Sequence, residues 1–169
     1  MNIGLLKPLW KLTGIDGDPM SDATQPRPAP QVIGWMEHLD LPSLGLLQIK
    51  AKIDTGARTS ALHATKIEAF ERDGEDWVRF MVQVDKASAP RQLEAPIYDR
   101  RAIKNTSGVP EERIVIRTKL RLTTKSWNIA VSLTDRGKMR FPMIIGRTAL
   151  KNHNIAVHTR RANLTQKEN

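Results

Sequence analysis

The chain has 169 residues, of which 40% are hydrophobic and 27% charged, and it contains no cysteine. This composition is typical of one globular domain, and the missing cysteine excludes disulfides, thiolate metal sites and cysteine nucleophiles. No apolar run approaches the roughly 20 residues that span a bilayer, and Pro8 and nearby lysines interrupt the apolar N-terminus before a signal peptide could form. We therefore expect a cytoplasmic protein that does not bind membranes.

The formal net charge of +9 is unevenly placed along the chain. Between Arg113 and Arg161 there are twelve Lys and Arg residues and one acid, Asp135, a local charge of +11, so the remainder sums to −2. This asymmetry favours an anionic partner such as an acidic peptide or a nucleic acid. A basic face that only contacts solvent is the alternative.

Residues 1–31 are rich in Gly and Pro, and they predict a flexible N-terminal arm. Within the arm, Met20-Ser21-Asp22 is a candidate for the natural start of the protein. Residues 32–160 are predicted to form the folded domain, and residues 161–169 a disordered tail.

The first half of the predicted domain reads mainly as strands. Residues 46–53 place apolar side chains at every second position, and residues 77–84 do the same after the hairpin turn signal Asp73-Gly74. Residues 60–70 are compatible with a strand or with a short helix.

The second half predicts a hairpin and a short helix. Residues 114–122 and 127–133 alternate apolar and polar side chains on either side of a turn at 123–126. The apolar run 141–145 follows, then a short helix at 148–152 with Thr148 as its cap, and a last strand at 155–157. Many short strands with one brief helix predict an all-β fold, a closed or nearly closed barrel.

The residues with the clearest chemical meaning are Asp54-Thr55-Gly56-Ala57, which directly follow the strand at 46–53. Alone, Asp-Thr-Gly is often only a turn. The segment Ile144-Ile145-Gly146-Arg147, just before the predicted helix, makes the motif more specific, because the pair resembles the active-site loop of retropepsins and the segment that packs beneath it.

The resemblance extends over residues 32–157. It is to a bacterial family labelled as ATP-dependent zinc proteases and grouped with the retropepsin-like endopeptidases. The stretches that carry it are Gly34-Trp35-Met36-Glu37, Leu41-Pro42, Leu44-Gly45, 51–64, Asp135-Arg136 and 139–147. It implies an acid-protease-like barrel with one lobe per chain.

By this resemblance, Asp54 is the catalytic residue. Thr55 braces the loop across a dimer, Gly56 offers its N–H to a carboxylate, and Ala57 permits close packing. Arg58, Ser60, His63, Ile145, Gly146 and Arg147 are the residues expected to support the loop or contact substrate, with an ion pair as the expected role of Arg147. The residue Glu37 also matches, and a salt bridge to an arginine is its expected role.

The sequence has one Asp-Thr-Gly, so the second carboxylate of an aspartic protease dyad has to come from another copy. The resemblance therefore predicts a homodimer with Asp54 facing its counterpart across a two-fold axis. Residues 100–113, with Asn105-Thr106-Ser107-Gly108 at the centre, are a candidate flap over the cleft, and an ordinary loop is the alternative.

The words "ATP-dependent" and "zinc" in the family label find no support in the sequence. There is no phosphate-binding G-x-x-x-x-G-K-[ST] motif and no His-Glu-x-x-His motif. The histidines are His38, His63, His153 and His158, and a zinc site from the last three remains an alternative. We predict no cofactor and no metal.

The leading hypothesis is an aspartic endopeptidase that hydrolyses peptide bonds by Asp-activated water. Members of the resembled family often sit beside ATP-grasp ligases that add glutamate to proteins, which implies a functional link to such a ligase and acidic, glutamate-rich substrates. The alternatives are a non-catalytic basic binding module for acidic peptide or RNA and a zinc-dependent peptidase.

Overall fold

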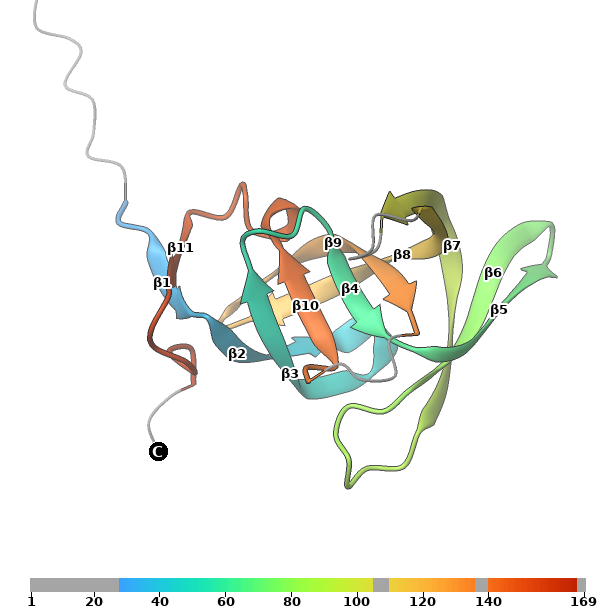
Figure 1. Ribbon diagram of the computed structural model, residues 1–169, viewed down its shortest axis with the longest axis horizontal. Helices are drawn as coiled ribbons and strands as arrows, with labels where there is room; N and C mark the ends of the chain where they lie inside the picture. Colours follow the sequence, from blue (N-terminus) through green and yellow to red (C-terminus); the bar gives the residue numbers. More distant parts are fainter. Residues whose placement is uncertain (1–27, 105–109, 136–139, 167–169) are drawn as a thin grey trace, which may run out of the picture.

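The computed structural model describes residues 28–104, 110–135 and 140–166. It is an all-β structure, as predicted (Figure 1). The strands are β1 (Gln31–Gly34), β2 (Met36–Leu41), β3 (Leu46–Asp54), β4 (Ser60–His63), β5 (Thr65–Arg72), β6 (Glu75–Val82), β7 (Arg91–Lys104), β8 (Pro110–Leu122), β9 (Lys125–Thr134), β10 (Met143–Gly146) and β11 (Ile155–His158).

Nine strands form one sheet in the order β2-β3-β10-β4-β9-β8-β7-β6-β5. β2 also pairs with β8, at Asp40 and Arg121. The strands β2-β3-β10-β4-β9-β8 therefore form a ring. The Arg121 side chain reinforces this junction, because its Nη2 lies 2.6 Å from Asp40 Oδ2. The ring thus closes through one backbone pair and one ion pair.

The core lies inside this ring of strands. On β3 the side chains of Ile49, Ala51 and Ile53 are buried, while Lys50 and Lys52 point outward. This is the alternation predicted for residues 46–53, and it follows from the period of two in a strand. The largest fully buried side chains include Phe80, Leu39, Leu62, Ile116, Met143 and Ile145.

The predicted hairpins are present. Asp73 and Gly74, with φ of 53° and 78°, form a two-residue turn between β5 and β6, which extend away from the ring (Figure 1). β8 and β9 pair around Thr123 and Thr124, a tighter turn than the four residues predicted. Residues 60–70, ambiguous in the sequence, form two strands, β4 and the first part of β5.

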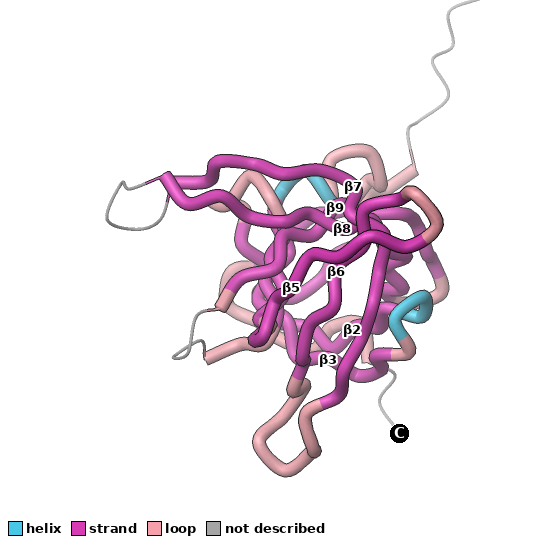
Figure 2. The backbone as a smooth tube through the Cα atoms, turned by 90° about the vertical axis from the view of Figure 1, so that its right-hand side faces the viewer, coloured by secondary structure: helices cyan, strands magenta, loops and turns pink. Residues whose placement is uncertain are grey.

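The helical content among the described residues is two single turns of 3-10 helix, η2 (Pro42–Leu44) and η3 (Arg147–Ala149) (Figure 2). The predicted helix at 148–152 is therefore shorter and begins one residue earlier. Its cap is Gly146, and the Thr148 hydroxyl instead donates to the carbonyl of Arg58. Neither turn, nor any other described helix, is long and apolar enough to cross a membrane.

A separate two-stranded parallel sheet joins the ends of the described chain, with Gln31 to Gly34 of β1 beside Ile155 to His158 of β11. Gln31, which was predicted to belong to the arm, is thus part of a strand. Residues 1–27 of the predicted arm lie outside the described residues. The C-terminal segment 161–166 lies along β2, because Trp35 N–H donates to the Arg161 carbonyl and Asn163 N–H to the Met36 carbonyl. The prediction of a disordered tail therefore does not hold for residues 161–166.

Candidate active site

The end of β3 carries Asp54, and β10 places Gly146 directly beside it. The two strands are parallel, with Ile145 opposite Ile53 and Gly146 opposite Asp54. The two sequence motifs that are ninety residues apart therefore meet at one end of the ring.

Backbone hydrogen bonds fasten the loop after Asp54 to η3. The Arg147 N–H donates to the Ala57 carbonyl at 2.9 Å, and the Thr148 N–H donates to the Arg58 carbonyl at 3.2 Å. The Thr148 hydroxyl donates to the same carbonyl at 2.7 Å. The loop conformation is thus fixed by the segment that follows β10.

Ser60 supports the loop from inside the core. Its side chain is fully buried, and its Oγ accepts the Gly146 N–H at 3.2 Å. Its carbonyl in turn accepts the Ser132 hydroxyl at 3.0 Å. Ser60 therefore braces the loop, and a buried hydroxyl with these partners has no path to substrate.

The two oxygens of the Asp54 carboxylate have different partners. Oδ1 accepts the N–H groups of Gly56 at 3.2 Å and Ala57 at 3.3 Å, and Oδ2 lies 3.0 Å from the Lys52 ammonium. The hydrogen bond from Lys52 is the main reason that the pKa of Asp54 is below its ordinary value. Its charge and the two N–H donors add to this effect, while partial burial opposes it.

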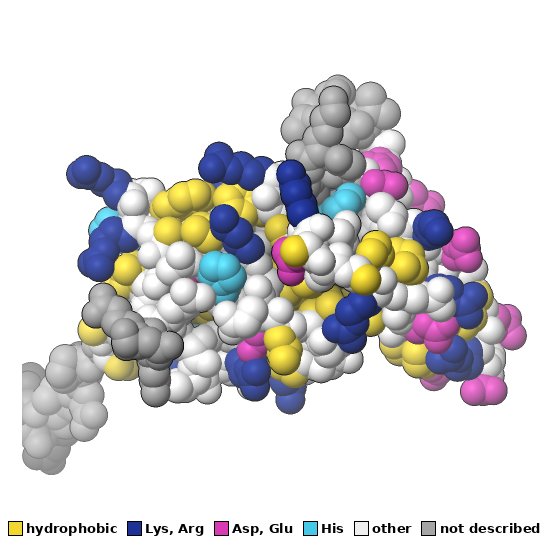
Figure 3. Space-filling view, turned by 90° about the horizontal axis from the view of Figure 1, so that it is seen from below, with side chains coloured by type: hydrophobic (Ala, Val, Ile, Leu, Met, Phe, Trp, Pro, Cys, Tyr) yellow, Lys and Arg dark blue, Asp and Glu magenta, His cyan; other side chains and the backbone are white. Residues whose placement is uncertain are grey.

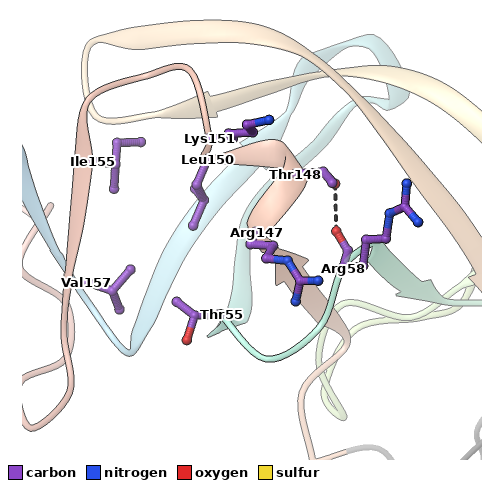
Figure 4. A pocket seen from close by; sticks show the side chains of 8 residues that line it. All are labelled: Thr55, Arg58, Arg147, Thr148, Leu150, Lys151, Ile155 and Val157. Carbon is purple, nitrogen blue, oxygen red and sulfur yellow. Dashed lines mark hydrogen bonds between the residues drawn. The ribbon is translucent and has the colours of Figure 1, made fainter.

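A cavity of about 590 Å³ opens beside the loop (Figure 4). The side chain of Thr55 faces it from one side, and Ile155 and Val157 of β11 from the other. The remaining lining residues are Leu150, Arg58, Arg147, Thr148 and Lys151. An apolar wall with cations at its rim thus lies directly next to the candidate catalytic loop.

Arg147 contacts the loop itself. Its Nη1 donates to the Gly56 carbonyl at 3.2 Å. In the described parts of the chain it takes part in no ion pair, so the expectation of an ion pair is replaced by a contact with backbone.

The comparisons with known proteins point to one family. The model of the RimB-like family, described as "Retropepsin-like aspartic endopeptidase RimB", matches residues 32–168. The chain belongs to the RimB-like family. The resemblance seen in the sequence is thereby confirmed.

The RimB-like region also occurs within longer proteins. The chain is 45% identical over 125 residues to a probable alpha-L-glutamate ligase of Desulfotalea psychrophila, and 43% identical over 122 residues to one of Parasynechococcus marenigrum. These matches cover 72% and 70% of the chain but 27% and 26% of the relatives. The chain thus spans about a quarter of the length of the curated relatives it matches.

A solved structure supports the fold. A Legionella pneumophila protein of unknown function (DUF785) superposes with a TM-score of 0.69 and 28% identity, over 80% of this chain and 98% of that one. The RimB-like fold is therefore shared with a protein of similar extent to the described domain.

The three histidines of the alternative zinc site, His63, His153 and His158, have separate surroundings in this RimB-like chain. His63 lines a second cavity of about 680 Å³, at the end of β4 away from Ser60, with Lys50, Lys86 and Arg140. His153 stacks on Trp127 with ring centroids 4.1 Å apart, and the Nδ1 of His158 accepts two backbone N–H groups. In the described part of the chain, no three His, Asp or Glu side chains are grouped as metal ligands.

The salt bridge expected between Glu37 and an arginine is wrong. Among the described residues, the fully buried carboxylate pairs with no arginine; it accepts the N–H groups of Gly34, Leu164 and Thr165 and the Thr165 hydroxyl. It therefore fastens the C-terminal segment to β2. Lys52 was also overlooked, although alternation along a strand places residues i and i+2 on one face and so predicts that it lies near Asp54.

The candidate flap is described only in part. Residues 100–104 of β7 pair with residues 110–114 of β8 as the arms of a hairpin. The tip, with Asn105-Thr106-Ser107-Gly108, lies outside the described residues.

Proposed function

We propose that this chain is an aspartic endopeptidase whose active site forms between two copies. The observation that carries the proposal is how the Asp54 carboxylate is held and exposed. Two loop N–H groups hold its Oδ1, and its side chain is 27% exposed at a loop braced by β10 and η3. This geometry suits a carboxylate that is fixed in direction and open to a substrate.

The second carboxylate would be Asp54 of a second copy. The cavity beside Thr55 supports this assembly, because its apolar wall of Leu150, Ile155 and Val157 offers a surface next to the loop that a second copy could cover. In an isologous dimer each loop meets its counterpart, which brings the two Asp54 side chains together at the axis.

The chemistry follows from two carboxylates held close together. They share one proton, because two adjacent negative charges are unfavourable. The ionised Asp54 removes a proton from a bound water, whose oxygen attacks the scissile carbonyl carbon, while the protonated Asp54 hydrogen-bonds to the carbonyl oxygen. As the C–N bond breaks, a proton passes to the amine nitrogen, and the dyad again holds one proton.

We propose acidic, glutamate-rich peptides as substrates. Two observations support this class: relatives that contain the RimB-like region are named probable alpha-L-glutamate ligases, and residues 113–161 carry a charge of +11. In Figure 3 the acidic side chains gather at the end formed by β5 and β6, and Lys and Arg side chains are frequent elsewhere on this face. A functional link between this peptidase and a glutamate ligase is part of the proposal.

The decisive experiment measures cleavage of a glutamate-rich peptide by the purified full chain and by Asp54→Asn. The variant should fold normally and cleave at least about a thousandfold more slowly, because its amide cannot act as a base. Asp76→Asn, an exposed change on β6, is the matched control and should keep full activity. Undiminished cleavage by Asp54→Asn would contradict the mechanism.

Mixing the two proteins tests the dimer. If each active site needs both Asp54 carboxylates, an equal mixture with Asp54→Asn after subunit exchange retains wild-type dimers as only about a quarter of the total. Activity per wild-type chain should then fall to about half. Activity per wild-type chain that is independent of the added variant would contradict a shared site.

A basic binding module is the second candidate, and one observation favours it. The cavity of about 680 Å³ near His63 is lined by Lys50, Lys86 and Arg140, with Asp85 as the acid among its lining residues. Salt-sensitive binding of an acidic peptide that survives in Asp54→Asn, without cleavage by the wild-type chain, would support this function in place of the peptidase. Loss of cleavage on adding a chelator would instead support a zinc-dependent peptidase.

A further inference from the structure

On the outward face of β3, Lys52 lies next to the candidate catalytic residue Asp54. Ala51 and Ile53 point into the core, so Lys52 and Asp54 share the outer face. The Lys52 ammonium lies 3.0 Å from Asp54 Oδ2, and its side chain is 44% exposed. The same cation thus contacts the carboxylate and remains accessible to a ligand.

The other cations near the loop are engaged differently. Arg147 donates to the Gly56 carbonyl, and Arg58 lines two cavities that both adjoin η3. The direct side-chain hydrogen bond to Asp54 among the described residues comes from Lys52. A group that binds next to Oδ2 of Asp54 therefore also lies close to the Lys52 ammonium.

We propose that Lys52 determines substrate specificity by pairing with the carboxylate of an acidic residue that flanks the scissile bond. This inference rests on the proposed peptidase function and deepens it, because it assigns acidic selectivity to one side chain. Peptide chemistry sets the distance: in an extended substrate, a flanking side chain lies within one or two residues of the scissile carbonyl, about 3.3 Å per residue.

Two effects give the selectivity. A substrate carboxylate offers Lys52 a second anionic partner, and the flexible four-carbon stem lets the ammonium turn towards it. With a neutral side chain at that position, Lys52 stays on Oδ2, the oxygen that is free of loop N–H donors and so is the one to engage water. An acidic residue thus gains an ion pair and also releases the catalytic oxygen.

The test compares two peptides that differ only by Glu or Gln beside the scissile bond, in kcat/KM with the full-length chain. The wild-type chain should prefer the Glu peptide by about tenfold or more, which is typical of a hydrogen bond to a charged group. In Lys52→Gln the preference should disappear, and in Lys52→Arg it should persist. Lys119→Gln, an exposed change on β8, is the matched control and should keep the wild-type preference.

The outcomes separate this inference from the proposed function. Circular dichroism first establishes that Lys52→Gln is folded, and Lys52→Glu adds a second variant, which should favour the Gln peptide. If the wild-type chain cleaves both peptides and Lys52→Gln keeps the wild-type preference, the specificity role is overturned and the peptidase stands. If the wild-type chain cleaves neither peptide, the proposed function is overturned, and the inference with it.

Discussion

Gly146 and Asp54 lie opposite each other on the parallel strands β10 and β3, at a point where no side chain fits on β10. A Cβ at Gly146 would come within 2.6 Å of both the carbonyl carbon and the oxygen of Thr59. These are backbone atoms, so they cannot move aside as a flexible side chain would. Glycine at this position lets the chain after the loop pass directly over β10.

Gly146→Ala is therefore expected to distort the loop. The added methyl should destabilise the fold by about 1–3 kcal/mol, as overpacking in a dense region does, and should lower peptidase activity beyond the loss of folded protein. Urea unfolding and kcat of the folded fraction measure the two effects.

Gly34→Ala is the matched control. A Cβ at Gly34 would lie 2.6 Å from the Arg161 carbonyl oxygen, an equally close contact with the C-terminal segment but not with the Asp54 loop. It should reduce stability to a similar degree and leave kcat of the folded protein near the wild-type value. Equal losses of kcat in the two variants would contradict the bracing role of Gly146.

Ser60→Ala tests the buried hydrogen bond beneath the loop. The change removes the acceptor of the Gly146 N–H and leaves this donor unpaired, which costs about 1–3 kcal/mol. Thr118→Val is the control, because the buried Thr118 hydroxyl has no partner among the described residues and its removal should be neutral or stabilising. Thermal unfolding of both variants measures the two effects. An unchanged melting temperature for Ser60→Ala would contradict a stabilising role for its hydrogen bond to Gly146.

The sequence predicts best where the reasons are local. The alternation of Ile49, Ala51 and Ile53 requires only the period of a strand, and the turn at Asp73-Gly74 requires only residues that tolerate positive φ. The meeting of the two motifs required the family resemblance to be predicted. They meet through the parallel pair of β10 and β3, which no short-range pattern in the sequence specifies.

Sequence-based expectations fail where the direction of a strand or contacts with distant residues determine the position of a side chain. His63 follows the loop closely in the chain, but strand β4 carries it away from Ser60 to the other cavity. Glu37 is buried because its partners come from residues 164 and 165, which lie more than a hundred positions later. Such contacts between irregular segments leave no periodic signal in the sequence.

Glu37→Gln tests whether the C-terminal segment depends on this carboxylate. An amide keeps one acceptor oxygen and loses the charge, so the hydrogen bonds from Leu164 and Thr165 should weaken. We expect a loss of about 2 kcal/mol and faster hydrogen exchange in residues 161–166. Glu112→Gln, whose side chain is 71% exposed, should change neither quantity. Unaltered exchange in Glu37→Gln would show that the segment is held by other contacts.

Lys52→Gln should change the titration of Asp54 in a defined direction. In the folded chain the Lys52 hydrogen bond and charge hold the pKa of Asp54 below its ordinary value. The ionised carboxylate therefore contributes stability at pH values above the pKa of the unfolded chain, and this contribution is lost as the pH falls through the lowered pKa. Removing Lys52 should raise the pKa of Asp54, weaken this contribution at neutral pH and move acid unfolding to higher pH.

The same change should displace the pH profile of cleavage. A dyad works when it holds one proton, so its activity rises as the first carboxyl ionises and falls as the second does. An ammonium beside each Asp54 favours both ionisations, and its loss should shift both limbs of the profile of kcat/KM to higher pH. Lys52→Arg keeps the positive charge and should keep the profile near that of the wild-type chain. Carbon-13 NMR of the Asp54 carboxyl gives the pKa directly, and an equal pKa in Lys52→Gln and the wild-type chain would exclude Lys52 as the cause.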